Sequence, residues 1–536
     1  MSTGPATIPA ALRAAAAQFG RHDAIVAEGE GPIAERTTSF AELDAQVDAF
    51  AGSLIALGIR SGDRVALWAP NGAPWIVASF AIYRVGAVLV PISTRYRGNE
   101  AGDILRRSAA VAIIAATDFM SPSTAEMLDG ESNLEGLEHR IVLTGDAPSG
   151  WISPDAFARF GDSINRSDVV AREAAIDGDD MSDLIFTSGT TGRPKGAMLR
   201  HHASIETYLQ WSERVGLRAG DRYLLVYPFF HTSGLKSGVL ACVLRGATIH
   251  PQAVFDVEAM MRRVPAEQIT MLPGPPTVFQ SILDHPNRDT FDLSSVRTSV
   301  TGAAVVPVEV IRRMREDLLI PDVVTGYGLT ETHGTVSVNR CDDTPEDVAL
   351  TIGTPLDGLD VCVVDDEGNE LPTGESGEFW VRGFNVMTGY FDDPAATAEA
   401  IVDDPNGAGS WLRTGDVGFV DDRGRLHITD RKKDMFIVGG FNAYPAEIES
   451  RLLEHPDILQ AAVVGVADDR MGEVGLAFLV LRPGGELRAD GLTEQLTPWC
   501  RERMANFKVP RVFRAEHSLP LNATGKVAKA ELRSRL

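Results

Sequence analysis

The chain has few cysteines and no uninterrupted apolar run of membrane-spanning length. Its four cysteines, Cys242, Cys341, Cys362 and Cys500, are far apart and form no CxxC pair, which excludes a disulfide framework or a paired-cysteine zinc site and indicates a reduced, cytoplasmic protein. The N-terminal segment lacks the basic start and apolar core of a signal peptide, so none is expected. Arg84 interrupts the most apolar stretch, which predicts a core helix and strand rather than a membrane span.

Basic residues are fewer than acidic residues. The chain has 50 lysines and arginines against 74 aspartates and glutamates, a net charge of −24. This charge argues against nucleic acid or an anionic membrane as a partner. Any anionic ligand would have to be held by local positive charge, because the field of the whole molecule repels it. With 536 residues, of which 44% are hydrophobic, the chain is long enough for about three or four average domains, or for one large α/β body with a smaller appended domain.

Helical and strand patterns alternate up to about residue 430. Amphipathic helices alternate with short apolar strands, which predicts a parallel sheet with helices on both faces. The clearest helices are expected over 42–59 and 75–86, and the clearest strands over 64–70 and 87–92. After residue 355 the pattern changes to strands punctuated by Asp-Gly-type turns, as in 359–383 and 418–431, which predicts hairpins.

A compact α+β unit is expected past residue 433. It contains a helix over 445–455, opened by Pro445, and a strand over 458–466. The charged junction at 425–434 marks the boundary. The predicted fold class is therefore α/β: a large N-terminal domain (1–432) of layered α/β subdomains plus a β-rich subdomain, and a small α+β C-terminal domain (433–536).

Residues 187–196, TSGTTGRPKG, form the most informative loop, and they follow an apolar run. Glycines let backbone N–H groups approach phosphate oxygens, hydroxyls add donors, and Lys195 adds a positive charge, so the loop suits a polyanion. It is neither a Walker loop, because Pro194 precedes Lys195, nor a GxGxxG dinucleotide loop. On composition alone, a flexible linker is the alternative interpretation.

Four further motifs follow in order: YGLTET at 327–332, WLRTGD at 411–416, DRKKDMFIVGGFNAYPAEIE at 430–449 and NATGKVAKAEL at 522–532. With the 187–196 loop, this series resembles the acyl- and aryl-CoA synthetase branch of the adenylate-forming superfamily over nearly the whole chain. The resemblance implies an AMP-forming acid–thiol ligase. A carboxylate attacks the α-phosphorus of ATP to give an acyl-adenylate and pyrophosphate, and the thiol of CoA then displaces AMP, so the site needs cations and oriented donors.

The resemblance also implies roles for individual residues. Those expected to bind ATP or AMP are Thr187, Ser188, Gly189, Thr190, Thr191 and Lys195 at the phosphates, Gly302, Ala303, Ala304, Tyr327 and Gly328 at the adenine, Thr330 at the α-phosphate, and Asp416 with Arg431 at the ribose. Glu331 would ligate Mg²⁺. Lys526 would bridge the substrate carboxylate and the α-phosphate. Lys526, His231, Thr330 and Glu331 are therefore the expected catalytic residues, although each residue type alone is more typical of a turn, a cap or a solvated surface.

His231 is expected to stand beside the carboxylate site. Amino-acid-activating domains of peptide synthetases typically have an aspartate there to pair with an α-ammonium group, and an imidazole cannot offer that salt bridge, so this class is excluded. The acyl pocket would be lined by His231, Thr232, Gly234, Lys236 and Gly302, with Lys236 either reaching the acid or CoA or extending to solvent. Small residues in this region suggest room for a wide substrate.

The resemblance implies that the C-terminal domain is mobile, with its hinge at Lys433. One face would bring Lys526 to the site for adenylation, and the other would serve thioester formation. The CoA-binding residues would be Gly439, Gly440, Phe507, Lys508 and Arg511, the last three of which also suit a solvated basic turn.

The substrate is the least readable feature. The segments LPGPPTVFQSILDHP and ANFKVPR look most similar to the sequences of actinobacterial synthetases that activate ring-containing acids from steroid breakdown. This resemblance favours a bulky alicyclic or terpenoid-like acid as the substrate. The alternatives are a medium-chain fatty or aromatic acid, or loading of a carrier protein's phosphopantetheine arm. The sequence also leaves open a homodimer, and whether both half-reactions are efficient.

Overall fold

A six-stranded sheet forms the first layer, in the order β6-β5-β3-β4-β7-β8, parallel except for the antiparallel pair β7 and β8. The computed structural model describes residues 4–27, 36–187, 194–302, 306–404, 407, 409–431, 434–438, 441–468, 470–522 and 526–536. The strands are β3 (Arg64–Trp68), β4 (Val88–Pro91), β5 (Ala112–Ala116), β6 (His139–Thr144), β7 (Met181–Thr187) and β8 (Lys195–Arg200).

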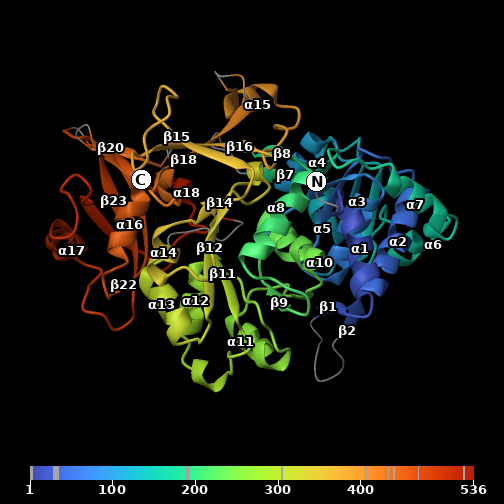
Figure 1. The fold of residues 1–536 in the computed structure, drawn as a ribbon, viewed down its shortest axis with the longest axis horizontal. Coiled ribbons are helices and arrows are strands. Elements are labelled where there is room, and N and C mark those ends of the chain that lie inside the picture. Colours follow the sequence, from blue (N-terminus) through green and yellow to red (C-terminus); the bar gives the residue numbers. More distant parts are fainter. Residues whose placement is uncertain are drawn as a thin grey trace.

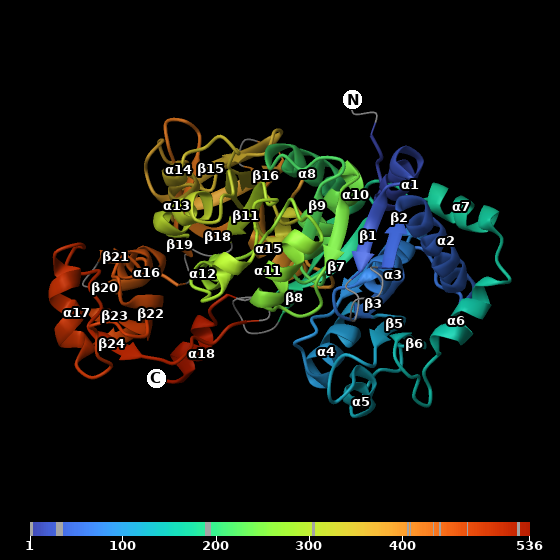
Figure 2. The same ribbon diagram turned by 90° about the horizontal axis from the view of Figure 1, so that it is seen from below.

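Helices cover both faces of this sheet, as the alternating pattern predicts. Val65 and Leu67 of β3 pack in one core with α2 and α3, whereas Ala66 and Trp68 pack in another with α4 and α5. Figure 2 shows α4 and α5 below the strands and α2 above them. The helices are α2 (Phe40–Ala56), α3 (Ala73–Arg84), α4 (Gly98–Ser108), α5 (Thr124–Asp129), α6 (Pro154–Gly161) and α7 (Arg166–Ala174).

A second sheet, in the order β2-β1-β10-β9, stands beside the first. Its strands are β1 (Asp23–Ala27), β2 (Arg36–Ser39), β9 (Arg222–Leu225) and β10 (Thr248–Pro251). The associated helices are α1 (Ile8–Phe19), α8 (His201–Arg214), α9 (Thr232–Gly234), the π-helix η1 (Leu235–Leu240) and α10 (Ala241–Arg245). Met271 bridges Tyr223 of β9 and Thr298 of β11, so this sheet continues into the next one.

The third sheet has the order β11-β12-β13-β14. Its strands are β11 (Thr298–Gly302), β12 (Asp322–Tyr327), β13 (Ser337–Val338) and β14 (Thr354–Pro355). The helices and short turns of this region are α11 (Val257–Ala266), α12 (Pro276–Leu283), η2 (Arg288–Thr290), α13 (Val308–Glu316), η3 (Thr330–Thr332) and α14 (Pro345–Leu350). β11 and β12 are parallel, so their carboxyl ends, Gly302 and Tyr327, lie at the same edge.

The hairpin pattern after residue 355 forms an antiparallel sheet in the order β15-β16-β18-β17, with β19 paired to β18. Its elements are β15 (Leu359–Val364), β16 (Gly377–Gly383), α15 (Pro394–Ala400), β17 (Ile401–Asp403), β18 (Ser410–Val420) and β19 (Leu426–Arg431). This is the predicted β-rich subdomain.

The C-terminal unit is a separate α+β layer, which Figures 1 and 2 both show in red at the end of the molecule opposite α2 and α6. Its strand order is β21-β20-β23-β22, with β24 paired to β23. The elements are β20 (Phe436–Val438), β21 (Phe441–Ala443), α16 (Pro445–Leu452), β22 (Ile458–Asp468), β23 (Gly472–Leu481), α17 (Leu492–Arg501), β24 (Val512–Ala515) and α18 (Lys529–Ser534).

The large and small α/β units agree with the predicted fold class. The boundary at 432/433 stays a prediction, and Lys433 lies outside the described residues. The apolar cores of the C-terminal unit contain only residues from Phe436 onward. Within the described ranges, no helix is long and apolar enough to cross a membrane.

Candidate active site

A cavity of about 1140 Å³ lies where several strand ends meet the C-terminal unit. Thr187 ends β7, Gly302 ends β11 and Tyr327 ends β12. Ligands of α/β proteins bind at such carboxyl edges. The cavity wall includes most of the predicted residues that the structure describes: Thr187, Lys195, His231, Thr232, Gly302, Tyr327, Gly328, Thr330, Glu331 and Lys526. Its volume exceeds that of a typical single-ligand pocket, which leaves room for two substrates.

Glu331 stands at one wall of this cavity. Its Oε1 atom accepts a hydrogen bond from the Thr187 hydroxyl at 3.3 Å and another from the Tyr390 hydroxyl at 2.8 Å. Lys195 Nζ lies 5.2 Å from the centre of the Tyr390 ring and 3.9 Å from Glu399 Oε2. Burial and the negative charge of Glu331 raise the pKa of Tyr390, so its phenol is protonated and remains a donor.

Sequence reasoning missed Tyr390, which contacts both Glu331 and Lys195. The residue lies in the loop between β16 and α15, where periodicity gives no signal. Its position is set by contacts with β8: Phe391 N donates to Gly196 O at 2.8 Å, and Met198 N donates to Gly389 O at 3.0 Å. The Gly-Tyr pair in the MTGYFDDP segment is the only local hint.

Asp416 lies just behind the cavity wall. Its side chain is buried, and Oδ2 accepts a hydrogen bond from the Tyr327 hydroxyl at 2.7 Å. Its neighbours Thr414 and Gly415 line the cavity. Arg431 is the register partner of Asp416 across β18 and β19, which brings the two predicted ribose residues together. The side chain of Arg431 lies outside the described residues.

His231 is held as a neutral imidazole. Burial lowers its pKa to about 4, and the positive charge of Lys526 adds to that shift. Its Nδ1 atom accepts from the backbone N–H of Ser233 at 3.3 Å at the start of α9. The proton of the neutral ring is therefore on Nε2, which can donate to an anionic ligand.

Lys526, in the C-terminal unit, lines the cavity. It is paired with Asn522: the side-chain oxygen of Asn522 accepts from Lys526 N at 2.9 Å, and Asn522 N donates to Lys526 O at 2.7 Å. Arg95, in the N-terminal region, donates to Asn522 O at 3.1 Å. The structure thus brings His231 of the large N-terminal part and Lys526 of the C-terminal unit to one cavity.

Lys236 corrects the sequence-based expectation. Neither acyl-pocket contact nor extension to solvent is found: the side chain is fully buried, absent from the cavity wall, and paired with Asp183 at 2.5 Å. Gly234 does not line the cavity either. It is buried, and a Cβ atom there would collide with the carbonyl oxygen of Pro228, so the glycine serves a tight turn.

The predicted CoA residues that the structure describes do not line this cavity. Phe507, Lys508 and Arg511 lie in the C-terminal unit, where Lys508 Nζ is 2.5 Å from Glu447 Oε1 and 5.5 Å from the centre of the Phe507 ring. The remaining predicted residues lie outside the described residues: Ser188, Gly189, Thr190, Thr191, Ala303, Ala304, Gly439 and Gly440.

Known proteins resemble the chain along its whole length. The AMP-binding enzyme family model matches residues 12–391, and the AMP-binding enzyme C-terminal domain model matches residues 447–526. A 3-[(3aS,4S,7aS)-7a-methyl-1,5-dioxo-octahydro-1H-inden-4-yl]propanoyl:CoA ligase of Rhodococcus jostii (strain RHA1) is 46% identical, with 99% of each chain covered. The ligase of the same name from Mycobacterium tuberculosis (strain ATCC 25618 / H37Rv) is 45% identical, with 98% of each chain covered.

A solved structure has the same fold. The crystal structure of the anthranilate CoA ligase AuaEII in complex with anthranoyl-AMP superposes with a TM-score of 0.85 at 27% identity, covering 99% of this chain and 97% of that one. The molecule bound in that complex, anthranoyl-AMP, is an acyl-adenylate.

Proposed function

The chain belongs to the AMP-binding enzyme family, and we propose that it is an acyl-CoA ligase that activates a bulky, ring-containing carboxylic acid. The acid would be converted to its acyl-adenylate with ATP, and the acyl group would pass to the thiol of CoA. The predicted membership of the adenylate-forming superfamily and the predicted class of AMP-forming acid–thiol ligase are confirmed by the family match and the full-length relatives.

One observation carries the substrate proposal: the two full-length relatives at 45–46% identity are both named for a propanoyl chain on a methylated, dioxo bicyclic ring. The large cavity is consistent with such an acid beside a nucleotide. A medium-chain fatty or aromatic acid remains the alternative that the experiment below must exclude.

The adenylation step joins two anions, so the residues must offset their repulsion. In the proposed arrangement, Lys195 and the Thr187 hydroxyl hold the distal phosphates while Thr330 contacts the α-phosphate. Lys526 and the Nε2 proton of His231 face the acid carboxylate. Positive charge and preorganised donors at the reacting oxygens are the largest usual source of rate enhancement for this chemistry.

Magnesium is proposed for the nucleotide phosphates. Mg²⁺ in such sites uses one or two carboxylates plus substrate phosphates, and Glu331, flanked by the Thr187 hydroxyl, fits that donor set. When bound, the ion would neutralise charge developing on the phosphates. Tyr390 would then orient Glu331 through the hydrogen bond to Oε1.

Thioester formation is proposed to use another face of the C-terminal unit, reached by rotation about Lys433. Gly439, Gly440, Phe507, Lys508 and Arg511 are the proposed CoA contacts, and Lys508 would have to leave Glu447 to meet a phosphate. Loading of a carrier protein, a homodimer and a cytoplasmic location stay predictions.

The test separates the two half-reactions. Purified protein would be given ATP, Mg²⁺ and a panel comprising a dioxo bicyclic propanoic acid, a medium-chain fatty acid and a cinnamic acid, and acid-dependent exchange of pyrophosphate into ATP would be measured. A second assay would supply pre-made acyl-adenylate with CoA, or with a phosphopantetheinylated carrier protein.

We expect exchange with the bicyclic acid at least about tenfold faster than with the others, which corresponds to about 1.4 kcal/mol of discrimination. We also expect transfer to CoA rather than to the carrier. Exchange that favours the straight-chain or cinnamic acid would overturn the substrate proposal. Transfer only to the carrier would overturn the proposed acceptor.

A further inference from the structure

Lys236 and Asp183 form a fully buried ion pair. Both side chains are 0% exposed, and Lys236 Nζ donates to Asp183 Oδ2 at 2.5 Å. The Tyr83 hydroxyl donates to Asp183 Oδ1 at 2.5 Å, and the Ser182 hydroxyl donates to Oδ2 at 2.5 Å. The Lys236 ammonium also lies 5.3 Å from the centre of the Tyr83 ring. Asp183 thus has a donor on each oxygen.

Nearby histidines do not add charge to this pair. Burial lowers the pKa of His201 to about 3 and that of His333 to about 4, so both rings are neutral near pH 7. Taking two charges fully out of water costs several kcal/mol each, and apolar side chains of similar size often serve stability equally well or better. Stability alone is therefore a weak explanation for the pair.

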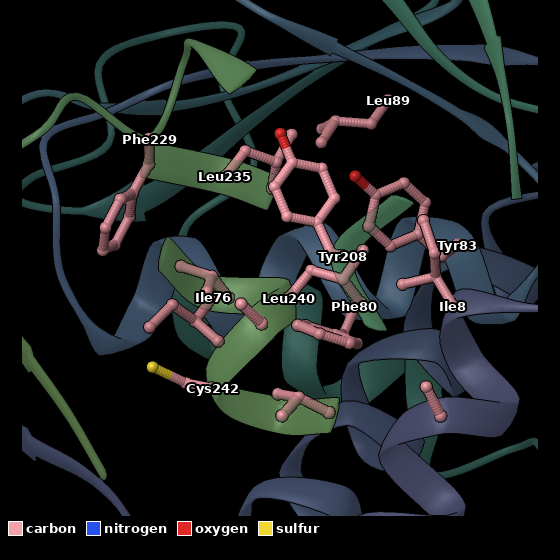
Figure 3. Packing of buried hydrophobic residues seen from close by; sticks show 14 of the residues in the cluster. Ile8, Ile76, Phe80, Tyr83, Leu89, Tyr208, Phe229, Leu235, Leu240 and Cys242 are labelled. Carbon is pink, nitrogen blue, oxygen red and sulfur yellow. The ribbon is translucent and has the colours of Figure 1, made fainter. Parts of the chain in front are cut away.

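The ion pair connects the chain segment that leads to the proposed ATP-phosphate site with the segment that carries His231, beside the proposed acid site. Asp183 lies on β7, which ends at Thr187 where the phosphate loop begins. Lys236 lies on η1, which directly follows His231 and α9. Leu89 of β4 is the register partner of Asp183, and Figure 3 shows Leu89, Tyr83 of α3 and Leu235 of η1 among the buried residues of one apolar cluster.

The backbone around Lys236 is itself unusual. η1 is a π-helix, a rare element that is often found at functional sites. Ser237 Oγ donates a hydrogen bond to Ser233 O, also at 2.5 Å. This bond stabilises the helical turn that contains Lys236 and connects it to Ser233 at the cavity wall. A displacement of Lys236 would therefore be transmitted to Ser233 and His231, both of which line the cavity.

We propose that the Lys236–Asp183 ion pair is a positioning device for adenylation, which fixes His231 and the bound acid relative to Thr187 and Lys195 in the same cavity wall. This inference rests on the proposed function. Attack on the α-phosphorus needs the reacting atoms about 3–3.5 Å apart, and a displacement of about 1 Å can reduce the rate about 100-fold. An ion pair with a donor on each oxygen resists sliding, whereas apolar contacts are non-directional.

The test compares the double variant Lys236→Met/Asp183→Asn with wild type. Lys236→Met alone would leave a buried carboxylate without its cation and should lower the thermal midpoint, whereas the double variant removes both charges and should recover much of it. We expect the double variant to lose about 10- to 100-fold in acid-dependent pyrophosphate exchange, with a higher KM for the acid. Transfer from pre-made acyl-adenylate to CoA should change by less than about threefold, because the acyl-phosphate bond already exists.

The matched control is a second buried pair. Arg263 NεH donates to Glu267 Oε1 at 2.6 Å at the end of α11, and neither residue lines the cavity. The double variant Arg263→Met/Glu267→Gln should affect the thermal midpoint without favouring one half-reaction. If Lys236→Met/Asp183→Asn does not fold, the variant Asp183→Glu takes its place. It keeps both charges but lengthens the acidic side chain by one methylene group, which shifts the ion pair. It should show the same loss of pyrophosphate exchange.

Three outcomes are informative. A folded double variant, or a folded Asp183→Glu variant, with wild-type exchange would overturn the inference, and so would an equal loss in both half-reactions. Wild-type protein that is silent with every acid would instead count against the proposed function, so failure of the two ideas can be told apart.

Discussion

At the residue scale, Lys526 supplies a positive charge at the cavity of this acidic molecule. It lines the cavity beside its hydrogen-bond partner Asn522 and lowers the pKa of His231, in addition to the larger effect of burial. We expect Lys526→Ala to lower acid-dependent pyrophosphate exchange by at least about 100-fold, the usual cost of removing one preorganised donor at the reacting oxygens. Transfer of pre-made acyl-adenylate to CoA should be nearly unchanged. An equal loss in both assays would mean that Lys526 is not specific to adenylation.

Tyr227 bears a hydroxyl that has no hydrogen-bond partner among the residues described. The residue lines the cavity, and burial raises the pKa of its phenol, so the group stays protonated. A ring oxo group of the acid would satisfy it. We expect Tyr227→Phe to raise the KM for a dioxo ring acid about tenfold, corresponding to a hydrogen bond worth about 1.4 kcal/mol, and to leave the KM for a medium-chain acid unchanged. Equal effects on both acids would contradict this assignment.

At the scale of elements, ion pairs of Arg84 connect its own helix α3 with α2 and α7. On α3 it is 0% exposed, and it lies 2.6 Å from Asp44 and 3.0 Å from Asp48 of α2, and 3.2 Å from Glu173 of α7. We expect Arg84→Met to lower the free energy of unfolding by about 3 kcal/mol, because the three carboxylates lose their fully buried cation and keep the partly exposed Arg13. Arg166→Met is the control: Arg166 is 74% exposed and pairs with the same Asp48, so its loss should cost less than about 1 kcal/mol. Similar losses in urea unfolding would contradict the assignment.

Local patterns located most elements within a few residues. The expected helix over 445–455 is found as Pro445–Leu452, and the expected strand over 64–70 as Arg64–Trp68. The boundaries that differ depend on which residues cap each end. α2, for example, begins at Phe40 because the Ser39 hydroxyl accepts from Glu42 N while the Glu42 carboxylate accepts from Ser39 N.

Contacts between distant elements were not readable from the sequence. The partner of Lys236 on η1 is Asp183 on β7, and a partner of Glu331 is Tyr390 in a loop. Sequence reasoning therefore placed Lys236 at the acyl pocket or the surface, because a lysine in an apolar run has no local signal for a buried anion. Motif order, in contrast, predicted that Lys195, His231, Tyr327 and Lys526 would meet, and all four line one cavity.

At the scale of the whole molecule, histidines whose pKa is lowered in the folded state make stability depend on pH. Burial lowers the pKa of His201 to about 3 and those of His231 and His333 to about 4, whereas the unfolded chain has the ordinary value of about 6.5. Between pH 6.5 and 4 the unfolded state binds more protons, so the free energy of unfolding falls as the pH falls. At pH 5 each histidine would cost up to about 2 kcal/mol relative to pH 7.

Urea unfolding at pH 7 and pH 5 measures this effect. His201→Gln retains an acceptor for Ile8 N, which donates to His201 Nδ1 at 3.3 Å, and removes one titrating group. We expect a smaller difference between the two pH values in this variant than in wild type. An unchanged difference would show that His201 does not titrate on unfolding.

Arg482 and Arg95 make polar contacts between the C-terminal unit and the rest of the molecule, in the arrangement that brings Lys526 to the cavity. Arg482, after β23, lies 3.2 Å from Asp284 at the end of α12, and Arg95 donates to Asn522 O at 3.1 Å. Both are exposed, so each is worth about 1 kcal/mol or less. If the C-terminal unit rotates between half-reactions, weakening them should lower the population of this arrangement only.

The double variant Arg95→Ala/Arg482→Ala tests this idea. We expect pyrophosphate exchange to slow by up to about fivefold, while transfer from pre-made acyl-adenylate to CoA stays the same or rises, because the lost contacts favour only one of the two arrangements. Raised salt should slow exchange by wild type but have less effect on the variant. Arg451→Ala is the control, since Arg451 pairs with Glu454 within the C-terminal unit. A parallel fall in both half-reactions would mean that these contacts stabilise the fold rather than select an arrangement.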